Sequence, residues 1–266
     1  METPNIRLDP SVICRRLAWV AVLLVVINIA MQTYRLAVQK EDVVGLVLMS
    51  LDKENNVPAL FSTLLLFTAS AVLAYIALFE RRRGSPDAAK WVVLTGGFAL
   101  MAVDESLSLH ERVIEPLRRL LGQAFGMEQL GIFYFAWVIP GLLLVAALAV
   151  FFVPFLFRLP RRTGVMLFVS AAIYLGGALG IELMEGWWRE DQGHRNIVYH
   201  AMVSLEEGME MIGVIVLIHT LLDFIATQQG GISMELAATR RASSVASVGP
   251  QTRQPGGQVL ESGGGE

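Results

Sequence analysis

Cysteine and charge are both scarce in this chain. Of its 266 residues only Cys14 is a cysteine, which excludes an intramolecular disulfide and a cysteine-rich metal site. Charged residues make up 17% of the sequence and hydrophobic residues 54%, a balance well beyond that of an ordinary soluble domain. The composition therefore predicts a polytopic membrane protein surrounded by the lipid bilayer.

Several motifs that identify enzymes and nucleic-acid-binding proteins are also missing. The sequence has no GxSxG nucleophile elbow, no glycine-rich phosphate-binding loop and no basic face for nucleic acid. The HxxxH pattern of ceramidase-type intramembrane hydrolases is missing too. Motifs therefore exclude a nucleic-acid partner and leave open whether the protein is an enzyme.

Six apolar segments are long enough to cross a membrane, which takes about 20 residues of helix. They cover residues 15–35, 58–79, 91–111, 132–157, 164–186 and 197–226. Arg15 and Arg16 precede the first segment, as in a signal peptide, but no A-x-A cleavage site follows it, so we expect it to be retained. The predicted fold is an all-α integral membrane protein with six transmembrane helices over residues 1–227.

The distribution of arginine predicts the orientation. The stretches "RRRGSPDAAK" after the second helix and "RLPRRT" after the fourth are basic, while the other loops carry at least as many acids as bases. By the positive-inside rule these two loops and both chain ends are cytoplasmic, an N-in/C-in arrangement. Residues 228–266, rich in Gly, Ser and Gln, are predicted to form a disordered cytoplasmic tail.

Two of the outer loops are predicted to contain helices that lie in the membrane interface. In "RVIEPLRRLLGQAFGMEQLG", apolar residues recur at helical spacing opposite Arg118 and Arg119. The stretch "EDVVGLVLMSLDK" before the second transmembrane helix has a similar character. Such helices either connect the spans or cover a site between them.

Carboxylates interrupt the outer ends of the predicted helices. The stretch "AVDESLSLHERV" ends the third, "GIELMEGWWRE" ends the fifth and "YHAMVSLEEGMEMIG" begins the sixth. Because these ends share one leaflet, residues distant in sequence are expected to converge at one depth. Burying the five innermost acids in ionised form would cost on the order of 10 to 15 kcal/mol, so something must neutralise them. These five are Asp104, Glu105, Glu206, Glu207 and Glu210.

Three agents can neutralise such a cluster, and the sequence leaves all three open. Divalent Fe, Mn or Zn is held by carboxylates and imidazoles in helical bundles, although the usual Glu-x-x-His pairs are missing here. Protons would make the cluster the coupling site of a proton- or cation-coupled transporter. Ion pairs, such as Glu185 with Arg189 at i+4, would account for the acids near the headgroups. Those acids are Glu182, Glu185, Asp52 and Glu54.

The leading prediction is a divalent metal site that faces outward between the third, fifth and sixth helices. At about 100° per residue, the histidine and the acids that begin the sixth helix fall within a third of its circumference. Gly176 and Gly180 form a GxxxG that lets a neighbouring helix approach closely. The predicted ligands are Asp104, Glu111, His200, Glu207 and Glu210, with Glu105, His110, Glu182 and Glu206 as supporting or alternative ligands.

The reaction is not specified by these residues. A catalytic metal would act on a lipid or quinone-like substrate that enters from the outer leaflet. A non-catalytic subunit or assembly factor of a membrane complex is the further alternative.

The stretches "VDESLSLHE", "FYFAWVIPG" and "SLEEGMEMIG" resemble those of a family of uncharacterised multi-pass bacterial membrane proteins. In that family DExxxxHE and EExxEM stretches stand at corresponding helix ends. The resemblance covers the third to sixth helices, about half of the chain. It implies a six-helix fold in a bacterial inner membrane and brings no established activity.

Overall fold

Helices form every regular element that the computed structural model describes, within residues 9–38, 45–53, 55–126 and 129–228. This confirms the predicted all-helical fold. The α-helices are α1 (Pro10–Val38), α2 (Leu46–Met49), α3 (Val57–Arg82), α4 (Ala88–Leu107), α5 (Leu109–Phe125), α6 (Val138–Leu156), α7 (Arg161–Leu175), α8 (Glu182–Gln192) and α9 (Ile197–Gln228). A 3-10 helix, η1 (Gly131–Phe133), and a π-helix, η2 (Gly176–Ile181), complete the set. Apart from Gln228, the predicted tail lies outside the described residues.

Five helices in the described part of the chain are long and apolar enough to cross a membrane. They are α1, α3, α6, α9 and the continuous helix α7–η2–α8, which runs from Arg161 to Gln192. Helices α4 and α5 meet the same criteria only as a pair, bent by 78°. The described chain therefore has five candidate spans, or six if the bent pair counts as one.

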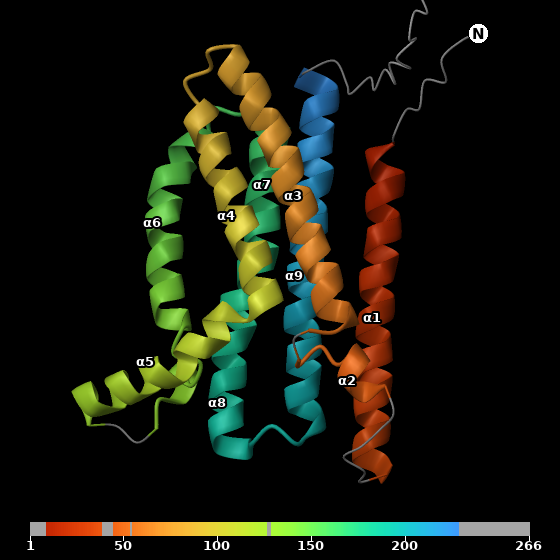
Figure 1. Ribbon diagram of the computed structural model, residues 1–266, viewed down its shortest axis with the longest axis vertical. Helices are drawn as coiled ribbons and strands as arrows, with labels where there is room; N and C mark the ends of the chain where they lie inside the picture. Colours follow the sequence, from red (N-terminus) through yellow and green to blue (C-terminus); the bar gives the residue numbers. More distant parts are fainter. Residues whose placement is uncertain (1–8, 39–44, 54, 127–128, 229–266) are drawn as a thin grey trace, which may run out of the picture. The chain divides into compact units, whose positions relative to one another are not determined.

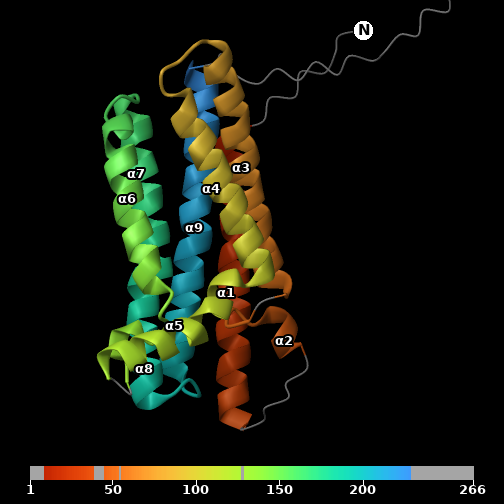
Figure 2. The ribbon, with the colours of Figure 1, turned by 60° about the vertical axis from the view of Figure 1, so that its left-hand side comes forward.

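The predicted third helix, residues 91–111, is broken at Ser108. This residue has a φ of 51°, in the left-handed region, and it separates α4 from α5. Over residues 109–124, helix α5 has no buried residue, and it leaves the direction of α4 sideways (Figures 1 and 2). It corresponds to the interfacial helix predicted for this loop, and its first turn carries His110 and Glu111.

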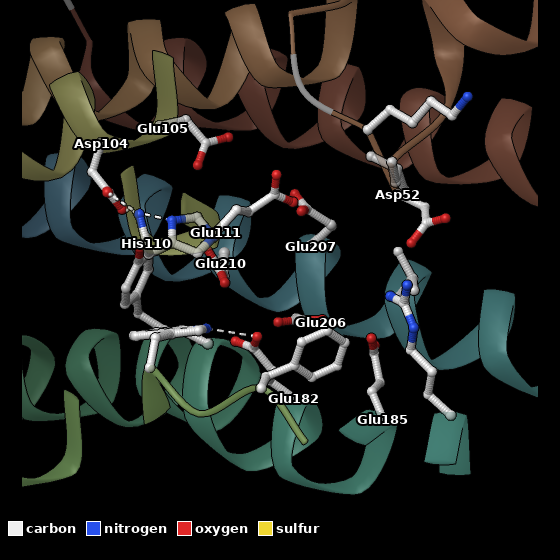
Figure 3. A pocket seen from close by; sticks show the side chains of 18 of the residues that line it. Asp52, Asp104, Glu105, His110, Glu111, Glu182, Glu185, Glu206, Glu207 and Glu210 are labelled. Carbon is white, nitrogen blue, oxygen red and sulfur yellow. Dashed lines mark hydrogen bonds and ion pairs between the residues drawn. The ribbon is translucent and has the colours of Figure 1, made fainter. Parts of the chain in front are cut away.

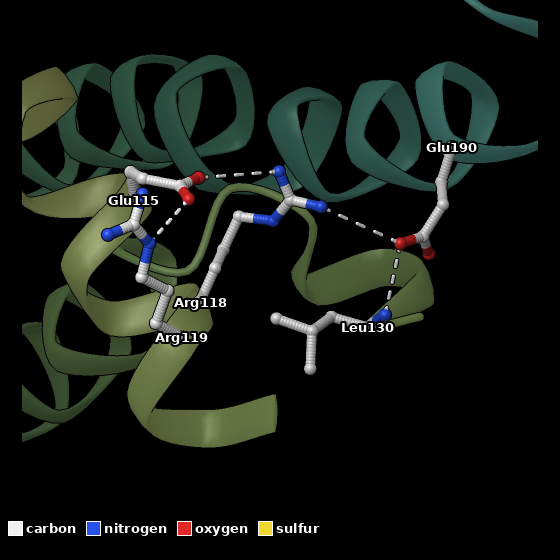
Figure 4. A network of polar contacts seen from close by, with 5 residues as sticks. All are labelled: Glu115, Arg118, Arg119, Leu130 and Glu190. Carbon is white, nitrogen blue, oxygen red and sulfur yellow. Dashed lines mark hydrogen bonds and ion pairs between the residues drawn. The ribbon is translucent and has the colours of Figure 1, made fainter. Parts of the chain in front are cut away.

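A network of polar contacts holds the loop after α5 against α8 (Figure 4). The backbone N–H groups of Leu130 and Gly131 both donate to the Glu190 carboxylate, the first at 3.1 Å. Arg118 lies 4.0 Å from the same carboxylate and 4.1 Å above the centre of the Tyr134 ring. These contacts connect α5 to the end of α8 through one partly buried acid.

Helix α9 occupies the centre of the helix arrangement. It packs against α1, α3, α7, α8 and η2, and both views show it between α1 and α7 (Figures 1 and 2). Helix α6, by contrast, buries only Val138 and Phe155. Most of the α6 surface is therefore available to lipid, whereas protein encloses several polar residues of α9, among them His200, Ser204 and Thr220.

Glycines permit the close approach of η2 to α9. A Cβ on Gly177 would lie 2.8 Å from the backbone oxygen of Glu206, and one on Gly176 would lie 2.9 Å from Met209 Cε. A Cβ on Gly180 would meet nothing within 4 Å. The close contact thus involves Gly176 and Gly177, whereas the predicted GxxxG pair included Gly180.

Buried asparagines fix the segment between α2 and α3. Asn28 Nδ2 on α1 donates to Ser204 Oγ on α9 at 2.9 Å, and Asn28 Oδ1 accepts from the Leu51 N–H at 3.1 Å. The Asn56 side chain caps α3, and its Nδ2 donates to two backbone oxygens of this segment, those of Ser50 at 2.6 Å and Lys53 at 2.7 Å. These bonds position Asp52, which faces the cavity described next.

Candidate functional site

A cavity of about 150 Å³ is lined by residues of α4, α5, α8 and α9 (Figure 3). The junction of α4 with α5 and helix α8 lie at the end of the helices opposite the arginine-rich loops (Figure 1). Carboxyl groups dominate the lining of the cavity, and Trp137, Tyr174 and Tyr199 are among its aromatic residues. We call this cavity the acidic pocket. Its charged and histidine residues are Asp52, Lys53, Asp104, Glu105, His110, Glu111, Glu182, Glu185, Arg189, Glu206, Glu207 and Glu210.

The acidic pocket contains eight of the nine predicted site residues, and the exception is His200. They come from α4, α5, α8 and α9, so the helix ends that carry acids do converge. The pocket also contains Asp52 and Glu185, two acids that the sequence assigned to ion pairs near the headgroups.

Asp104 and His110 form a doubly hydrogen-bonded pair across the break at Ser108. Asp104 Oδ1 accepts from the His110 backbone N–H at 2.9 Å, and Asp104 Oδ2 lies 2.8 Å from His110 Nδ1. The backbone bond satisfies one of the free N–H groups at the start of α5. The side-chain bond fixes the orientation of the imidazole ring.

Trp137 connects His110 to the acid on the opposite wall. Its ring centroid lies 5.2 Å from that of His110, at an angle of 55°. Its Nε1 donates a 2.7 Å hydrogen bond to Glu182 Oε1 (Figure 3). The Glu182 side chain is thus held by a donor that precedes α6, although Glu182 itself begins α8.

Glu185 is a buried acid of the pocket with one unsatisfied oxygen. The residue is only 3% exposed, and its Oε1 has no hydrogen-bond partner in the described structure. Its carboxyl group also lies beside that of Glu206 on α9 (Figure 3). Two carboxyl groups side by side need a proton or a cation between them, because two bare negative charges would repel each other.

The predicted ion pair between Glu185 and Arg189 is not among the ion pairs within 4.0 Å of the described residues. Arg189 instead donates to the Tyr199 hydroxyl at 3.2 Å, and its guanidinium lies 5.3 Å from the centre of the Tyr134 ring. The Tyr199 hydroxyl in turn donates to Asp52 Oδ1 at 3.1 Å. Arg189 therefore leaves Glu185 without a direct counter-charge.

His200 lies outside the acidic pocket, between α1 and α9. It is 3% exposed, and its Nε2 lies 2.8 Å from a guanidinium nitrogen of Arg35. A guanidinium is only a donor, so His200 Nε2 is the acceptor and its lone pair is already used. The helical wheel of α9 placed His200 in one sector with the glutamates. In the structure His200 contacts α1, whereas the glutamates of the same sector face the acidic pocket.

The acidic residues of the pocket do not continue toward the opposite end of the helices. A smaller cavity of about 10 Å³ adjoins the acidic pocket and shares Glu105, Tyr174 and Glu210 with it. Apart from these three, Ser62 is the one polar residue among those that line the smaller cavity. Along α9, every buried side chain over residues 211–218 is apolar. The pocket is therefore a recess at one end of the helices in this conformation.

The present side-chain positions do not form a finished metal site. Within residues 9–38, 45–53, 55–126 and 129–228, no three His, Cys, Asp or Glu side chains are grouped so that they could hold an ion. Most of the acids are glutamates, whose three side-chain torsions allow the carboxyl group to move. Binding of an ion would therefore include a rearrangement of these side chains.

Sequence reasoning missed three contributors to the pocket. Trp137 gave no signal, because an aromatic residue at a helix end is usual in membrane proteins. Glu185 did give one, since it stands one turn after Glu182 on the same helix face. Asp52 depends on the packing of the loop before α3, which local sequence does not reveal.

The chain belongs to the family described as a domain of unknown function, DUF8692, whose model matches residues 17–224. The match extends from within α1 to within α9 and includes every residue of the acidic pocket. Neither a curated protein nor a solved structure matches the chain.

Proposed function

We propose that this DUF8692 protein is an integral membrane protein whose acidic pocket binds a divalent metal ion on the outer side of the membrane. One observation carries the proposal: a buried carboxylate, Glu185, points an unpartnered oxygen into a pocket that other carboxyl groups surround. A buried charge persists only when it is paired, and no basic side chain contacts this one within 4.0 Å in the described chain. A bound cation would supply the missing charge.

The balance of charge in the lining supports a cation. Nine carboxyl groups line the acidic pocket, whereas its basic residues are His110, Lys53 and Arg189. Arg189 is occupied by the Tyr199 hydroxyl, and Lys53 is exposed. Acidic groups therefore outnumber basic groups in the lining, and the resulting negative potential attracts cations into the pocket.

The donor set fits a first-row transition metal. Carboxylate oxygens together with one imidazole suit Mn, Fe or Zn, and the absence of cysteine thiolates from the lining disfavours softer ions. The residues that would hold the ion are Glu185, Glu206, Glu182 and His110. A bound ion of this kind would polarise a substrate oxygen or activate water. The lipid or quinone-like substrate suggested by the sequence stays a prediction.

The orientation follows from the ends of the helices. The arginine-rich loops at residues 81–83 and 158–162 lie together at the end opposite the acidic pocket (Figure 1). The positive-inside rule assigns that end to the cytoplasm, which gives an N-in/C-in topology with the pocket facing outward. Together with the sequence resemblance, this supports location in a bacterial inner membrane.

Proton- or cation-coupled transport is the second candidate. The proximity of the Glu185 and Glu206 carboxyl groups favours it, because a shared proton would allow the two groups to lie side by side. A transporter also needs access from the other side. The apolar residues of α9 beyond Glu210 provide no such route in this conformation. Metal binding is therefore the better-supported function.

Metal content tests the proposal directly. The full-length protein would be purified in detergent without added metal and measured by inductively coupled plasma mass spectrometry, beside Glu185→Gln and Glu115→Gln variants. Glu115 is the matched control, because it is 57% exposed and pairs with Arg119 outside the pocket. Near-stoichiometric Mn, Fe or Zn that falls in Glu185→Gln alone would support the site. Folded wild-type protein that neither retains these metals nor takes them up on dialysis would overturn it.

A further inference from the structure

The two histidines near the outer helix ends have different environments. His200, the imidazole ligand predicted from the sequence, is enclosed between α1 and α9, and its Nε2 accepts a hydrogen bond from Arg35. In the neutral ring the remaining nitrogen, Nδ1, then carries the hydrogen and cannot bind a metal. A metal on His200 would require the loss of the Arg35 contact and movement out of a site where the residue is 3% exposed.

His110 has the opposite arrangement. It lines the acidic pocket, and its Nδ1 lies 2.8 Å from a carboxylate oxygen of Asp104, which only accepts. In the neutral ring Nδ1 therefore carries the hydrogen and Nε2 has the lone pair. This carboxylate–imidazole pairing is the arrangement that fixes the tautomer and raises the basicity of metal-binding histidines.

Two further contacts restrict the His110 ring. The backbone N–H of the same residue donates to the second oxygen of Asp104, so one carboxylate holds both ends of the residue. Trp137 packs against the ring and donates through Nε1 to Glu182 Oε1. The indole thus sets the distance between an imidazole on α5 and a carboxylate on α8.

We propose that His110 supplies the nitrogen ligand of the acidic pocket, that Glu182 supplies a carboxylate ligand on the opposite wall, and that Asp104 and Trp137 position them. This inference rests on the proposed metal-binding function. It exchanges the roles that the sequence predicted, in which Asp104 and His200 were ligands and His110 had a supporting role. Asp104 and Trp137 are positioning residues, because they act through the side chains they hold.

The expected effects differ between ligands and positioning residues. His110→Ala removes the nitrogen ligand altogether. Asp104→Ala leaves the imidazole in place without its orienting partner, a loss that typically weakens metal binding by about 10- to 100-fold. Asp104→Asn retains an oxygen acceptor for Nδ1 and should recover part of this loss. Trp137→Phe keeps an aromatic ring beside His110 but removes the donor to Glu182, and we expect binding to weaken by about 10-fold.

Titration with Mn²⁺ under electron paramagnetic resonance tests this assignment in the full-length protein in detergent. The loss of the free-ion signal gives the dissociation constant, and electron spin echo modulation detects a coordinated ¹⁴N nucleus. We expect a nitrogen signal in the wild type and in His200→Ala, Asp104→Asn and Asp104→Ala, and none in His110→Ala. A purely structural role for His110 would alter the unfolding temperature but would leave the nitrogen signal of the bound ion unchanged.

The remaining outcomes separate the two proposals. Tight Mn²⁺ binding with a nitrogen signal that is lost in His200→Ala and retained in His110→Ala would overturn the assignment while leaving the metal site intact. Tight binding without any nitrogen signal would overturn it as well and indicate a site made only of carboxylates. Wild-type protein that is folded and binds no Mn²⁺, Fe²⁺ or Zn²⁺ would overturn both the metal site and the assignment.

Discussion

Trp137 and Glu182 are 45 residues apart in the sequence, yet the indole Nε1 donates a 2.7 Å hydrogen bond to Glu182 Oε1. The bond joins the residue that precedes α6 to the first residue of α8. It satisfies one carboxylate of the acidic pocket with a neutral donor. Glu185, one turn further along α8, receives no comparable donor at its Oε1.

Replacing Glu185 with Gln should stabilise the metal-free protein. The substitution removes a buried negative charge and supplies an amide N–H that can donate to Glu206, so we expect the free energy of unfolding to rise by about 1 kcal/mol or more. Thermal unfolding in detergent with a chelator present measures the change, and Glu115→Gln should leave the midpoint unaltered. An unchanged midpoint for Glu185→Gln would contradict the prediction and indicate that Glu185 is already neutral through a bound proton.

Two glycines of η2 should respond differently to alanine. The Cβ of Gly177→Ala would lie 2.8 Å from a backbone oxygen of α9, which cannot move without displacing the helix, so we expect a loss of about 1 to 3 kcal/mol. Gly180→Ala meets open space and should be neutral or stabilising by up to about 1 kcal/mol. Unfolding midpoints of the two variants compare them directly. Equal destabilisation would mean that Gly180 also faces a neighbouring helix, as the GxxxG prediction had it.

Removing Glu190 should loosen the loop between α5 and α6. Glu190→Ala deprives the Leu130 and Gly131 N–H groups of their acceptor, at a cost of about 1 to 3 kcal/mol for partly buried donors. We expect faster amide hydrogen exchange at residues 129–131 and in α5. Glu115→Ala is the control, since it removes ion pairs with Arg118 and Arg119 within α5 but leaves the acceptor of the two N–H groups in place, so exchange at residues 129–131 should change little. Unaltered exchange in Glu190→Ala would show that the apolar contacts of α5 suffice to hold it.

The loop at the predicted cytoplasmic end should show a weak dependence of stability on pH. A hydrogen bond from Arg158 lowers the pKa of Asp87, against the smaller opposing effect of burial. A lowered folded-state pKa contributes stability above the unfolded value of about 3.9, and this contribution disappears as the pH falls through the folded value. Arg158 is half exposed, so Asp87→Asn should cost less than about 1 kcal/mol at pH 7.

The pH dependence of the difference in stability between wild type and Asp87→Asn is the sharper test. The difference in the free energy of unfolding should be constant from about pH 5 to 8 and should disappear below about pH 4, because the protonated Asp87 then resembles asparagine. One molar salt should shrink the difference at pH 7. Unfolding midpoints across this range measure it, and a difference that widened toward acid pH would show that another group causes the effect.

Much of the fold was accessible from sequence because its determinant, a long apolar run, is local. The last span was predicted at residues 197–226, and α9 covers Ile197–Gln228. The break at Ser108 was not accessible, since "ESLSLHE" contains neither Pro nor Gly and continues a helical pattern. Two hydrogen bonds between Asp104 and His110 stabilise it. Such a tertiary arrangement has no signature in the local sequence.

The sequence predicted the composition of the acidic pocket better than it predicted the geometry of the pocket. Convergence of the acids depends only on which helix ends share a leaflet, and charge patterning gives that. The direction of His200 depends on where α1 packs and on the reach of Arg35, which a helical wheel does not contain. The hydrogen bond from Trp137 to Glu182 likewise depends on the relative depth of two helices.

The π-helical segment η2 determines which way α8 faces. A π-helix closes i→i+5 hydrogen bonds, so it holds a residue more than the α-helical turn it replaces, and one residue corresponds to about 100° of rotation. Glu182 and Glu185 lie at the start of α8, directly after η2, so this rotation sets the direction of their side chains. Loss of a single codon within η2 would turn both acids away from α9 while leaving their identities unchanged. In this protein a deletion can therefore remove the pocket as effectively as a substitution, because the count of residues between α7 and α8 is itself part of the site.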